Sequence, residues 1–394
     1  MANSSRLQGL VPLAVIGLAA CGGTETLAPV PIDAPFASIH AGFLHTCGVT
    51  TSGAAYCWGW NRDGELGDGS RTDRPFPVRV SSAVPFVDVS AGAGHTCGVT
   101  TGNAVFCWGF NLTGQLGNGS NSASPTPVPV TGGWLLRSIA AGGAFTCAVG
   151  VDSAGACWGW NGNGQLGDGS KTDRNAPAAV SGALKLVAVS AGVQHTCGLA
   201  ADSTAYCWGR NDLGQLGDST IIESATPVAV KGGRKFIVVA VGYAHTCALT
   251  SGGDAYCWGD NSSGQMGDTV RSSSSVPVRV VGARVYLALS TGASHTCAVA
   301  TGNTVYCWGS NAGGQLGGSA TENCSTPAGA PYPCSHRPIP IFGTLTFAMV
   351  SAGNQHTCAL TTGQVAYCWG YNSNGQLGDA TKTGSETPVR VAGQ

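Results

Sequence analysis

Short apolar runs separated by Gly, Asn and Pro recur along the chain with a period of about 50 residues. One such unit has four runs, at residues 77–80, 86–90, 96–100 and 104–109. Runs of this length are typical of β-strands and are too short for helices. Thr101-Gly102-Asn103 separates the last two runs and predicts a tight hairpin. The pattern therefore predicts a repeating unit of four antiparallel strands.

Fixed short motifs mark the repeats. His-Thr-Cys occurs six times, with Phe145-Thr-Cys in the third unit, and Cys-Trp-Gly begins ten residues after the cysteine of each. One variable residue later comes Asn-x-x-Gly-Gln-Leu-Gly, in which Glu65 and Met266 are the only departures at the Gln and Leu positions. Units start 50 residues apart, except that the last step is 61 residues. The sixth unit therefore carries an 11-residue insertion, at about 318–340.

Seven units of four strands predict an all-β protein, a seven-bladed β-propeller over residues 36–394. The folded part begins with residues 36–39, which match the second run of a unit, and ends with residues 388–391, which match the first run. We therefore expect the N-terminal and C-terminal strands to share one blade. Such a closure would leave no open sheet edge between the chain ends.

The repeated Ala-Gly-x-x-His-Thr and Trp-Gly-x-Asn-x-x-Gly-Gln-Leu-Gly segments resemble the regulator of chromosome condensation repeat, a family of seven-bladed propellers. The resemblance covers residues 36–394 and implies the fold. Family members include nucleotide-exchange factors for a small nuclear GTPase, ubiquitin-ligase domains, plant photoreceptors and a secreted bacterial inhibitor of β-lactamase. Exchange activity is therefore one alternative function, and it would require a cytosolic protein. The paired cysteines depart from the usual family pattern.

The N-terminus predicts export. Leu7–Ala20 is an apolar run too short to span a bilayer as a helix, and it is typical of a signal peptide, which we place at residues 1–20. Leu18-Ala19-Ala20-Cys21 resembles the bacterial lipobox, which implies lipidation of Cys21. Residues 21–35 then form a flexible tether. We expect an exported, membrane-anchored lipoprotein of the outer membrane or cell surface. The alternative is a plain secretory signal with a chance cysteine.

The 17 cysteines divide without remainder if Cys21 carries lipid. A hairpin that pairs Thr100 with Ala104 sets Cys97 opposite Cys107, at a distance that a disulfide can bridge. A zinc site formed by His95, Cys97 and Cys107 is one alternative, and free buried thiols are the other. Against zinc stand Phe145 at the third histidine position, the lack of a recurring fourth ligand, and export. We expect eight disulfides and no metal or cofactor: Cys47–Cys57, Cys97–Cys107, Cys147–Cys157, Cys197–Cys207, Cys247–Cys257, Cys297–Cys307, Cys324–Cys334 and Cys358–Cys368.

Composition narrows the function further. The chain has 61 Gly, 43% hydrophobic and only 10% charged residues, which excludes a coiled coil and a disordered protein. A net charge of −1 argues against nucleic acid as a partner. The recurring histidines are expected to stabilise the blades, by hydrogen bonds to a neighbouring loop. Because no position gathers a nucleophile, a base and an orienting acid, we expect a protein that is not an enzyme.

Candidate binding residues lie where the repeats differ. The residue after Trp-Gly is aromatic in four consecutive blades of a closed ring, Tyr371, Trp60, Phe110 and Trp160, and polar in the others, Arg210, Asp260 and Ser310. We expect this aromatic arc to bind a partner, although such rings could also merely cap each blade. The insertion supplies further candidates, Tyr332, His336 and Arg337, or is a tolerated surface loop.

The predicted function is a monomeric scaffold that binds an extracellular or periplasmic protein and is attached to the membrane through its N-terminal lipid. The alternative is a module that binds carbohydrate at the cell surface.

Overall fold

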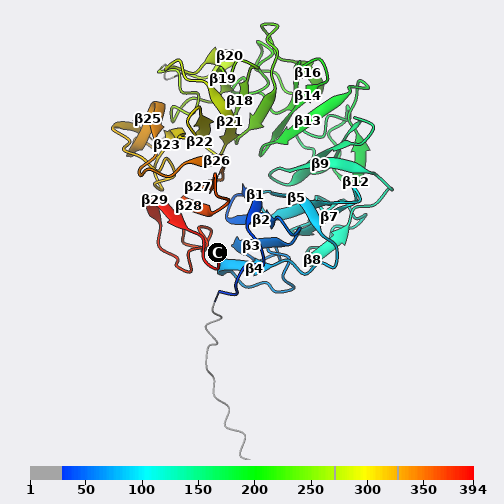
Figure 1. Cartoon of the computed structure of the whole chain (residues 1–394). Coiled ribbons are helices and arrows are strands. Elements are labelled where there is room, and N and C mark those ends of the chain that lie inside the picture. The colour runs from blue at the N-terminus through cyan, green and yellow to red at the C-terminus, as the bar shows by residue number, and fades with distance from the viewer. Residues whose placement is uncertain (1–28, 270–271, 326–327) are drawn as a thin grey trace, which may run out of the picture.

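The computed structural model describes residues 29–269, 272–325 and 328–394, which form seven β-sheets arranged around a central axis (Figure 1). The predicted fold class, an all-β seven-bladed propeller, is confirmed. Within these residues, no helix is long and apolar enough to cross a membrane. The predicted signal peptide, Cys21 and tether residues 22–28 lie outside the described residues.

Each blade consists of strands that are consecutive in the chain. Six sheets have four strands, and the sixth blade has five, in the order β21-β22-β23-β25-β24. The innermost strands are β1 (Phe36–Ala41), β5 (Phe86–Ala91), β9 (Leu136–Ala141), β13 (Leu186–Ala191), β17 (Val238–Val241), β21 (Tyr286–Thr291) and β26 (Phe347–Ala352). The second strands are β2 (His45–Thr50), β6 (His95–Thr100), β10 (Phe145–Gly150), β14 (His195–Ala200), β18 (His245–Leu249), β22 (His295–Ala300) and β27 (His356–Thr361).

The third strands are β3 (Ala55–Gly59), β7 (Val105–Gly109), β11 (Gly155–Gly159), β15 (Ala205–Gly209), β19 (Ala255–Gly259), β23 (Val305–Ser310) and β28 (Ala366–Gly370). The outer strands are β4 (Arg74–Arg79), β8 (Ser124–Pro129), β12 (Arg174–Ala179), β16 (Ser224–Ala229), β20 (Ser274–Arg279), β25 (Pro331–Pro340) and β29 (Ser385–Arg390). The additional strand β24 (Glu322–Ser325) and the first half of β25 form a two-stranded ribbon in the predicted insertion.

The two ends of the ring carry different loops. At one end lie the long loops after each third strand, such as residues 60–73, and the short loops between first and second strands, such as 42–44; we call this end the wide-loop face. At the other end lie the hairpins between second and third strands, such as residues 51–54, and the connections from blade to blade, such as 80–85. We call this end the hairpin face.

The second and third strands of each blade are joined by a disulfide. Cys97 pairs directly with Cys107 in the β6–β7 ladder, as the hairpin register predicts, and the two sulfurs are bonded. The structure has the same bond in the other six blades, and Cys324–Cys334 in the ribbon is the eighth disulfide. The bonded sulfurs lie in the core between blades, where Cys97 and Cys107 pack with Trp158 of the next blade.

A repeated hydrogen-bond network holds each blade to the next. The main-chain oxygen of Glu65 accepts hydrogen bonds from the Thr96 hydroxyl and the Trp108 indole of the following blade, both at 2.9 Å. Because the Thr96 hydroxyl donates to that oxygen, the 2.8 Å bond from His45 requires Nε2–H of the imidazole as donor. The histidine therefore binds a strand residue of the neighbouring blade, rather than a loop as the sequence suggested.

The Asn-x-x-Gly-Gln-Leu-Gly turn serves this network. The Asn61 side-chain oxygen accepts from the Leu66 amide at 2.9 Å, and its Nδ2 donates to the main-chain oxygens of Ser70 and Thr72. Gly67 has φ +68°, and a Cβ there would lie 2.7 Å from Trp108 Nε1. The asparagine and glycines thus bring the carbonyl of residue 65 within reach of the next blade.

Ring closure differs from the sequence prediction. The last strand, β29, pairs with β28 of its own blade, and β1 pairs with β2, so the terminal strands do not share a blade. The run that we took as the first strand of a unit is the outer strand of the preceding blade, since Cys57 pairs with Val78 and Gly59 with Arg74. Prolines 75 and 77 suit an outer edge, because proline offers no amide hydrogen to a further strand.

The ring closes instead by the contacts that join every other pair of blades. Thr46 of the first blade donates to the main-chain oxygen of Gln376 and binds His356 Nε2, both at 2.9 Å. The Trp58 indole donates to the same oxygen at 3.0 Å. The Ile32 amide also donates to the main-chain oxygen of Gly393 at 2.9 Å. Residues 32–35 of the predicted tether are thus attached to the ring.

Six histidines are buried at equivalent positions, and burial lowers the pKa of His45 and His245 to about 4 and of the other four to about 3. Their Nδ1 atoms have no hydrogen-bond partner among the described residues. The unfolded chain binds protons on these side chains near pH 6.5, whereas the folded chain does not. The contribution of these histidines to stability is therefore fully present above about pH 6.5 and is lost as the pH falls toward the folded pKa values.

His95→Phe copies the natural Phe145 of the third blade. Because the unfolded variant binds one proton fewer, we expect its unfolding free energy to fall less steeply than that of the wild type as the pH is lowered from neutral to about 4. Denaturant titrations at a series of pH values measure this slope. Phe145→His is the matched control and should steepen it. An unchanged slope in His95→Phe would contradict the assignment of a neutral imidazole.

Removing one blade disulfide, with Cys97→Ala and Cys107→Ala, should lower the unfolding free energy by about 2–3 kcal/mol from chain entropy alone, with a further loss from the core contact with Trp158. Cys324→Ala with Cys334→Ala removes a bond of the same sequence separation in the ribbon, and should cost less. Chemical denaturation compares the two. If both double variants lost the same unfolding free energy, the blade disulfide would stabilise the protein only by restricting the unfolded chain, and not by its packing against Trp158.

Candidate functional site

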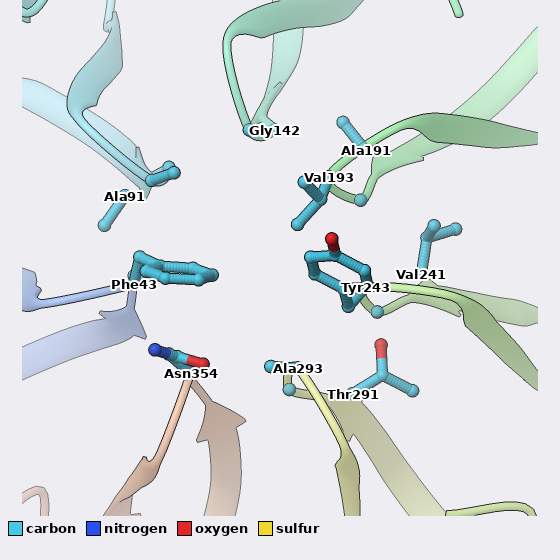
Figure 2. A pocket seen from close by; sticks show the side chains of 18 of the residues that line it. Phe43, Ala91, Gly142, Ala191, Val193, Val241, Tyr243, Thr291, Ala293 and Asn354 are labelled. Carbon is cyan, nitrogen blue, oxygen red and sulfur yellow. The ribbon is translucent and has the colours of Figure 1, made fainter. Parts of the chain in front are cut away.

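The centre of the wide-loop face is a hollow on the ring axis. It is lined by the Ala-Gly-x loops that precede the second strands, and Phe43 and Tyr243 point into it from opposite sides (Figure 2). Val193 and Asn354 line the same opening. Its volume is about 90 Å³, room for about three waters and well below the roughly 300 Å³ of an ordinary small-molecule pocket. A nucleotide or sugar would not enter it.

Main-chain bonds between loops make the opening narrow. The Phe43 amide donates to the oxygen of Gly92 at 3.0 Å, and the Ala93 amide donates to the oxygen of Gly142 at 3.0 Å. Asn354 bonds to Gly42 in the same way and completes the junction between the last and first blades. A Cβ at Gly92 would lie 2.6 Å from the oxygen of Gly142. Only glycine allows the loops to approach this closely, which fixes the positions of the variable residues that follow.

The residues after Trp-Gly lie farther out on the wide-loop face. Their amides make equivalent bonds, such as Trp60 to the oxygen of Leu44 at 3.0 Å. Trp60, Phe110 and Trp160 are half-buried, and Tyr371 is 38% exposed. The Arg62 guanidinium lies over the Trp60 ring, 5.3 Å from its centre. Since the last blade contacts the first, the four aromatic residues occupy consecutive blades as predicted.

The three polar residues at this position are engaged locally. Arg210 forms an ion pair with Asp212, and this pair raises the pKa of Arg210 and lowers that of Asp212. Asp260 accepts hydrogen bonds from Ser262 and from the Gln265 side chain. Ser310 is buried. Each of these polar side chains therefore has a partner in its own blade.

The ribbon of the sixth blade leans on the neighbouring fifth blade, and this overturns one binding prediction. His336 is 3% exposed, and its Nδ1 bonds to Glu322 at 2.6 Å. A Cβ at Gly264 would lie 2.8 Å from the His336 Cα. The side chain is therefore packed against a loop and presents no surface to a partner. Tyr332 is half-buried, with its hydroxyl 2.8 Å from Ser263 Oγ. Of the three predicted residues, Arg337 alone is exposed.

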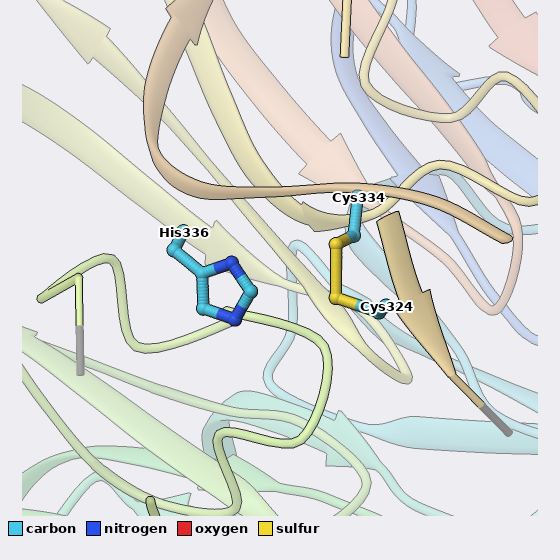
Figure 3. A group of neighbouring side chains, drawn as sticks. All are labelled: Cys324, Cys334 and His336. Atoms are coloured by element: carbon cyan, nitrogen blue, oxygen red, sulfur yellow. A yellow bond between two sulfur atoms is a disulfide. The ribbon is translucent and has the colours of Figure 1, made fainter. Parts of the chain in front are cut away.

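The ribbon also holds the one convergent group of possible metal ligands found among the described residues. Ligand atoms of Cys324, Cys334 and His336 lie within 4.8 Å of one another (Figure 3). Both sulfurs are bonded in a disulfide, however, and metal binding requires thiolates. As it stands, this group stabilises the ribbon.

The axial residues Phe43, Val193, Tyr243 and Asn354 were missed by the sequence analysis. They occupy the position after the glycine of the Ala-Gly segment, which is Val-Gly before Tyr243, and this position varies as much between blades as the one after Trp-Gly. Writing the seven repeats in register would have found them. Tyr243 is 41% exposed and is the most accessible large side chain at the axis.

A second hollow, of about 460 Å³, lies between the second and third blades. It is lined by polar side chains, including Asn121, Asp173, Arg174 and Asn175. Asp173 accepts from the Asn161 amide at 2.8 Å, next to Trp160 of the aromatic arc, and Arg174 is paired with Asp168. This groove is open and has more polar lining than the axial opening.

Profile comparison identifies the repeat. The profile of the regulator of chromosome condensation (RCC1) repeat matches residues 52–99, 103–149, 157–199, 202–249, 252–299 and 303–360. A second profile of the same description matches 36–65, 86–115, 186–215, 236–265, 287–315 and 350–376. Over 44 residues, the chain is 54% identical to the ultraviolet-B receptor UVR8 of Arabidopsis thaliana. The matched segment is 11% of this chain and only 10% of that protein.

Solved structures share the fold. Human WBSCR16 matches with a TM-score of 0.76 and 20% identity, over 86% of this chain and 94% of that one. Yeast RCC1 (Prp20), solved bound to Kap60, matches with a TM-score of 0.76 and 19% identity, over 97% and 91%. The CRINKLY WD40 ectodomain of the Arabidopsis thaliana receptor kinase ACR4 matches with a TM-score of 0.54 and 19% identity, over 91% of this chain and 99% of that one. At these identities the likeness concerns the fold alone.

Glu65, in the long loop of the first blade, is a buried carboxyl where the other six repeats have Gln. Burial raises its pKa to about 7, and the charges of Asp63 and Asp73 act in the same direction. Because the unfolded carboxyl titrates near 4.5, the folded state loses stability as the pH rises from that value through about 7. At about 1.4 kcal/mol for each pKa unit, the loss is at most about 3 kcal/mol.

Glu65→Gln should therefore stabilise the protein above pH 7 and have little effect near pH 5, as measured by denaturant unfolding at both pH values. Gln165→Glu places the same carboxyl in the third blade and should create the opposite trend. A stability difference for Glu65→Gln that does not change with pH would show that Glu65 does not titrate in this range.

Proposed function

Because the chain belongs to the regulator of chromosome condensation (RCC1) repeat family, we propose that it is a non-catalytic scaffold that binds a protein partner through its wide-loop face. The observation that supports this proposal is that shared and variable residues of each repeat lie in different places. The residues common to the blades, such as the Trp of Trp-Gly, are buried in contacts between blades. The residues that vary lie on the wide-loop face, where those after Ala-Gly line the axial opening and those after Trp-Gly lie farther out.

The electrostatics of the buried residues support a non-catalytic role. The six repeated imidazoles are neutral and use Nε2 to bind the next blade, so they are not accessible as bases. Half-exposed aromatic side chains contribute large, rigid contact areas to protein interfaces. Yeast RCC1 (Prp20), which shares the fold, is described in complex with Kap60 and as binding Gsp1p and histones. Protein partners are thus in keeping with this architecture.

We propose further that the protein is exported and anchored to a membrane through a lipid on Cys21. Eight disulfides fit an oxidising compartment, and Cys21 is the one cysteine left over. Intact mass of the protein from native membranes tests this: cleavage before Cys21, added acyl mass and sixteen thiols that appear only after reduction are the expected result. An unprocessed N-terminus with free thiols would instead favour the cytosolic exchange-factor alternative.

Partner binding should depend on the aromatic arc. Trp60→Ala with Phe110→Ala should weaken the protein partner's affinity by about 10- to 100-fold, since two anchor side chains are lost. A photo-crosslinking residue at position 110 identifies the partner in producing cells, and calorimetric titration then measures the variants. Arg210→Ala with Asp260→Ala, at the equivalent positions on the polar side, is the matched control. A partner that crosslinks equally from Val87 on the hairpin face would contradict the choice of face.

Carbohydrate binding is the second candidate, and the polar groove beside Trp160 favours it. Asn121, Asp173 and Asn175 offer donors and acceptors in this groove. Asn121→Ala with Asn175→Ala would then abolish retention on cell-surface glycans while protein binding persists. Retention that is unaffected by these changes would remove this candidate.

A further inference from the structure

Three consecutive connections on the hairpin face share one arrangement, in the blades drawn green to yellow in Figure 1. Each brings a basic residue, then a buried anchor, then an exposed aliphatic residue: Lys185-Leu186-Val187, Lys235-Phe236-Ile237 and, with Val285 inserted, Arg284-Tyr286-Leu287. We call residues 184–187, 231–237 and 284–287 together the hairpin patch. The middle residues hold the connections against the blades, so the outer side chains are displayed on fixed supports.

Two of the three aliphatic residues are exposed at β-bulges, where the strand pairing skips one residue. The β13–β14 ladder skips Val187, and the β21–β22 ladder skips Leu287, so both residues bulge out of their sheets. Ile237 directly precedes β17. These three residues are 48%, 56% and 57% exposed in the order Val187, Leu287, Ile237. Bulges redirect side chains, and here they direct Val187 and Leu287 to solvent, while Ile237 is exposed just before its strand begins.

Positive charge gathers around the same three connections. Seven basic residues lie on this side of the hairpin face: Arg137, Lys185, Lys231, Arg234, Lys235, Arg279 and Arg284. The facing hairpins carry three acidic residues, Asp152, Asp202 and Asp254, and Asp202 and Asp254 are paired with Lys235 and Arg279.

Two of the basic side chains make cation–π contacts with aromatic rings. Arg234 lies over Tyr256 at 4.6 Å and Arg284 over Tyr306 at 4.3 Å. The long loops of two of the same blades, 210–223 and 260–273, carry five acidic and two basic residues. The ring is therefore polarised, with the excess of positive charge on the hairpin face.

The N-terminal segment joins the ring at the hairpin face as well. Asp33 accepts hydrogen bonds from the hydroxyls of Thr50 and Ser52, in and beside the first hairpin, and the Ile32 amide binds Gly393. Cys21 precedes Ile32 by 11 residues, which span at most about 40 Å. If Cys21 is lipidated, as the proposed function holds, the hairpin face lies within that distance of the bilayer.

We propose that the hairpin patch docks onto an anionic phospholipid surface. Lysine and arginine are attracted to anionic headgroups, and isolated aliphatic side chains at loop ends insert beneath them. A bilayer fits these protrusions better than a protein, because Val187, Ile237 and Leu287 stand on separate blades around the axis. Docking leaves the wide-loop face directed away from the membrane and free to bind a partner.

Co-sedimentation of the full chain carrying Cys21→Ser with vesicles tests the proposal without a contribution from the lipid anchor. We expect binding to phosphatidylcholine vesicles that contain phosphatidylglycerol, little binding to phosphatidylcholine alone, and weakening by salt. Lys185→Gln, Lys231→Gln and Lys235→Gln together should lower the partition coefficient by about 100-fold, at about fivefold for each charge. Ile237→Ser with Leu287→Ser should lower it as well.

The matched control removes three basic residues from the wide-loop face, with Arg62→Gln, Arg71→Gln and Lys382→Gln, and should leave vesicle binding unchanged. Equal binding to neutral and anionic vesicles, or an equal loss in this control, would overturn the proposal. Binding to soluble polyglutamate but not to anionic vesicles would assign the patch to an acidic protein instead. Because the Cys21→Ser chain is used, neither a missing lipid nor a missing wide-loop partner affects the result.

Discussion

The carbonyl of residue 65 and its counterparts in the other blades are the points on which the ring depends. Each carbonyl oxygen accepts hydrogen bonds from a threonine hydroxyl and a tryptophan indole of the next blade. In six of the seven junctions, the threonine hydroxyl in turn accepts a hydrogen bond from a histidine Nε2–H. These groups are buried, so a broken bond would leave a polar atom without water. The neighbouring blade therefore constrains the threonine, tryptophan and histidine positions, whereas any residue supplies the main-chain carbonyl, and this explains why those three residue types recur so regularly.

The same constraint determines where the protein is able to vary. Replacing the threonine or tryptophan of a junction would leave a buried carbonyl without its donor, whereas Phe43 and Trp60 bond to nearby loops through their main-chain amides. Side chains at such positions are free to differ between blades while their backbone stays fixed. Variation is thus confined to the face without disturbing the junctions. A rigid ring with replaceable side chains is well suited to recognition of a large surface.

Much of the fold could be predicted because strand pairing inside a hairpin follows from residue spacing; Cys97 and Cys107 needed only the register of one turn. Ring closure could not, because an edge strand can join either of two adjacent sheets, and only the prolines at 75 and 77 hinted at an outer edge. His336 was misjudged for a related reason. Alternation along a strand says which residues share a side, but not that a loop of another blade, at Gly264, covers that side.

Among the described residues, each blade is formed by strands that are consecutive in the chain, and no sheet takes a strand from the far end of the sequence. The N-terminal segment at Ile32 bonds to Gly393, near the C-terminus. A new start point could therefore be opened in any connection between blades, and the old ends joined, without dividing a sheet. For the same reason, recombination between repeats would exchange whole blades, which offers this lineage a simple route to new combinations of surface residues.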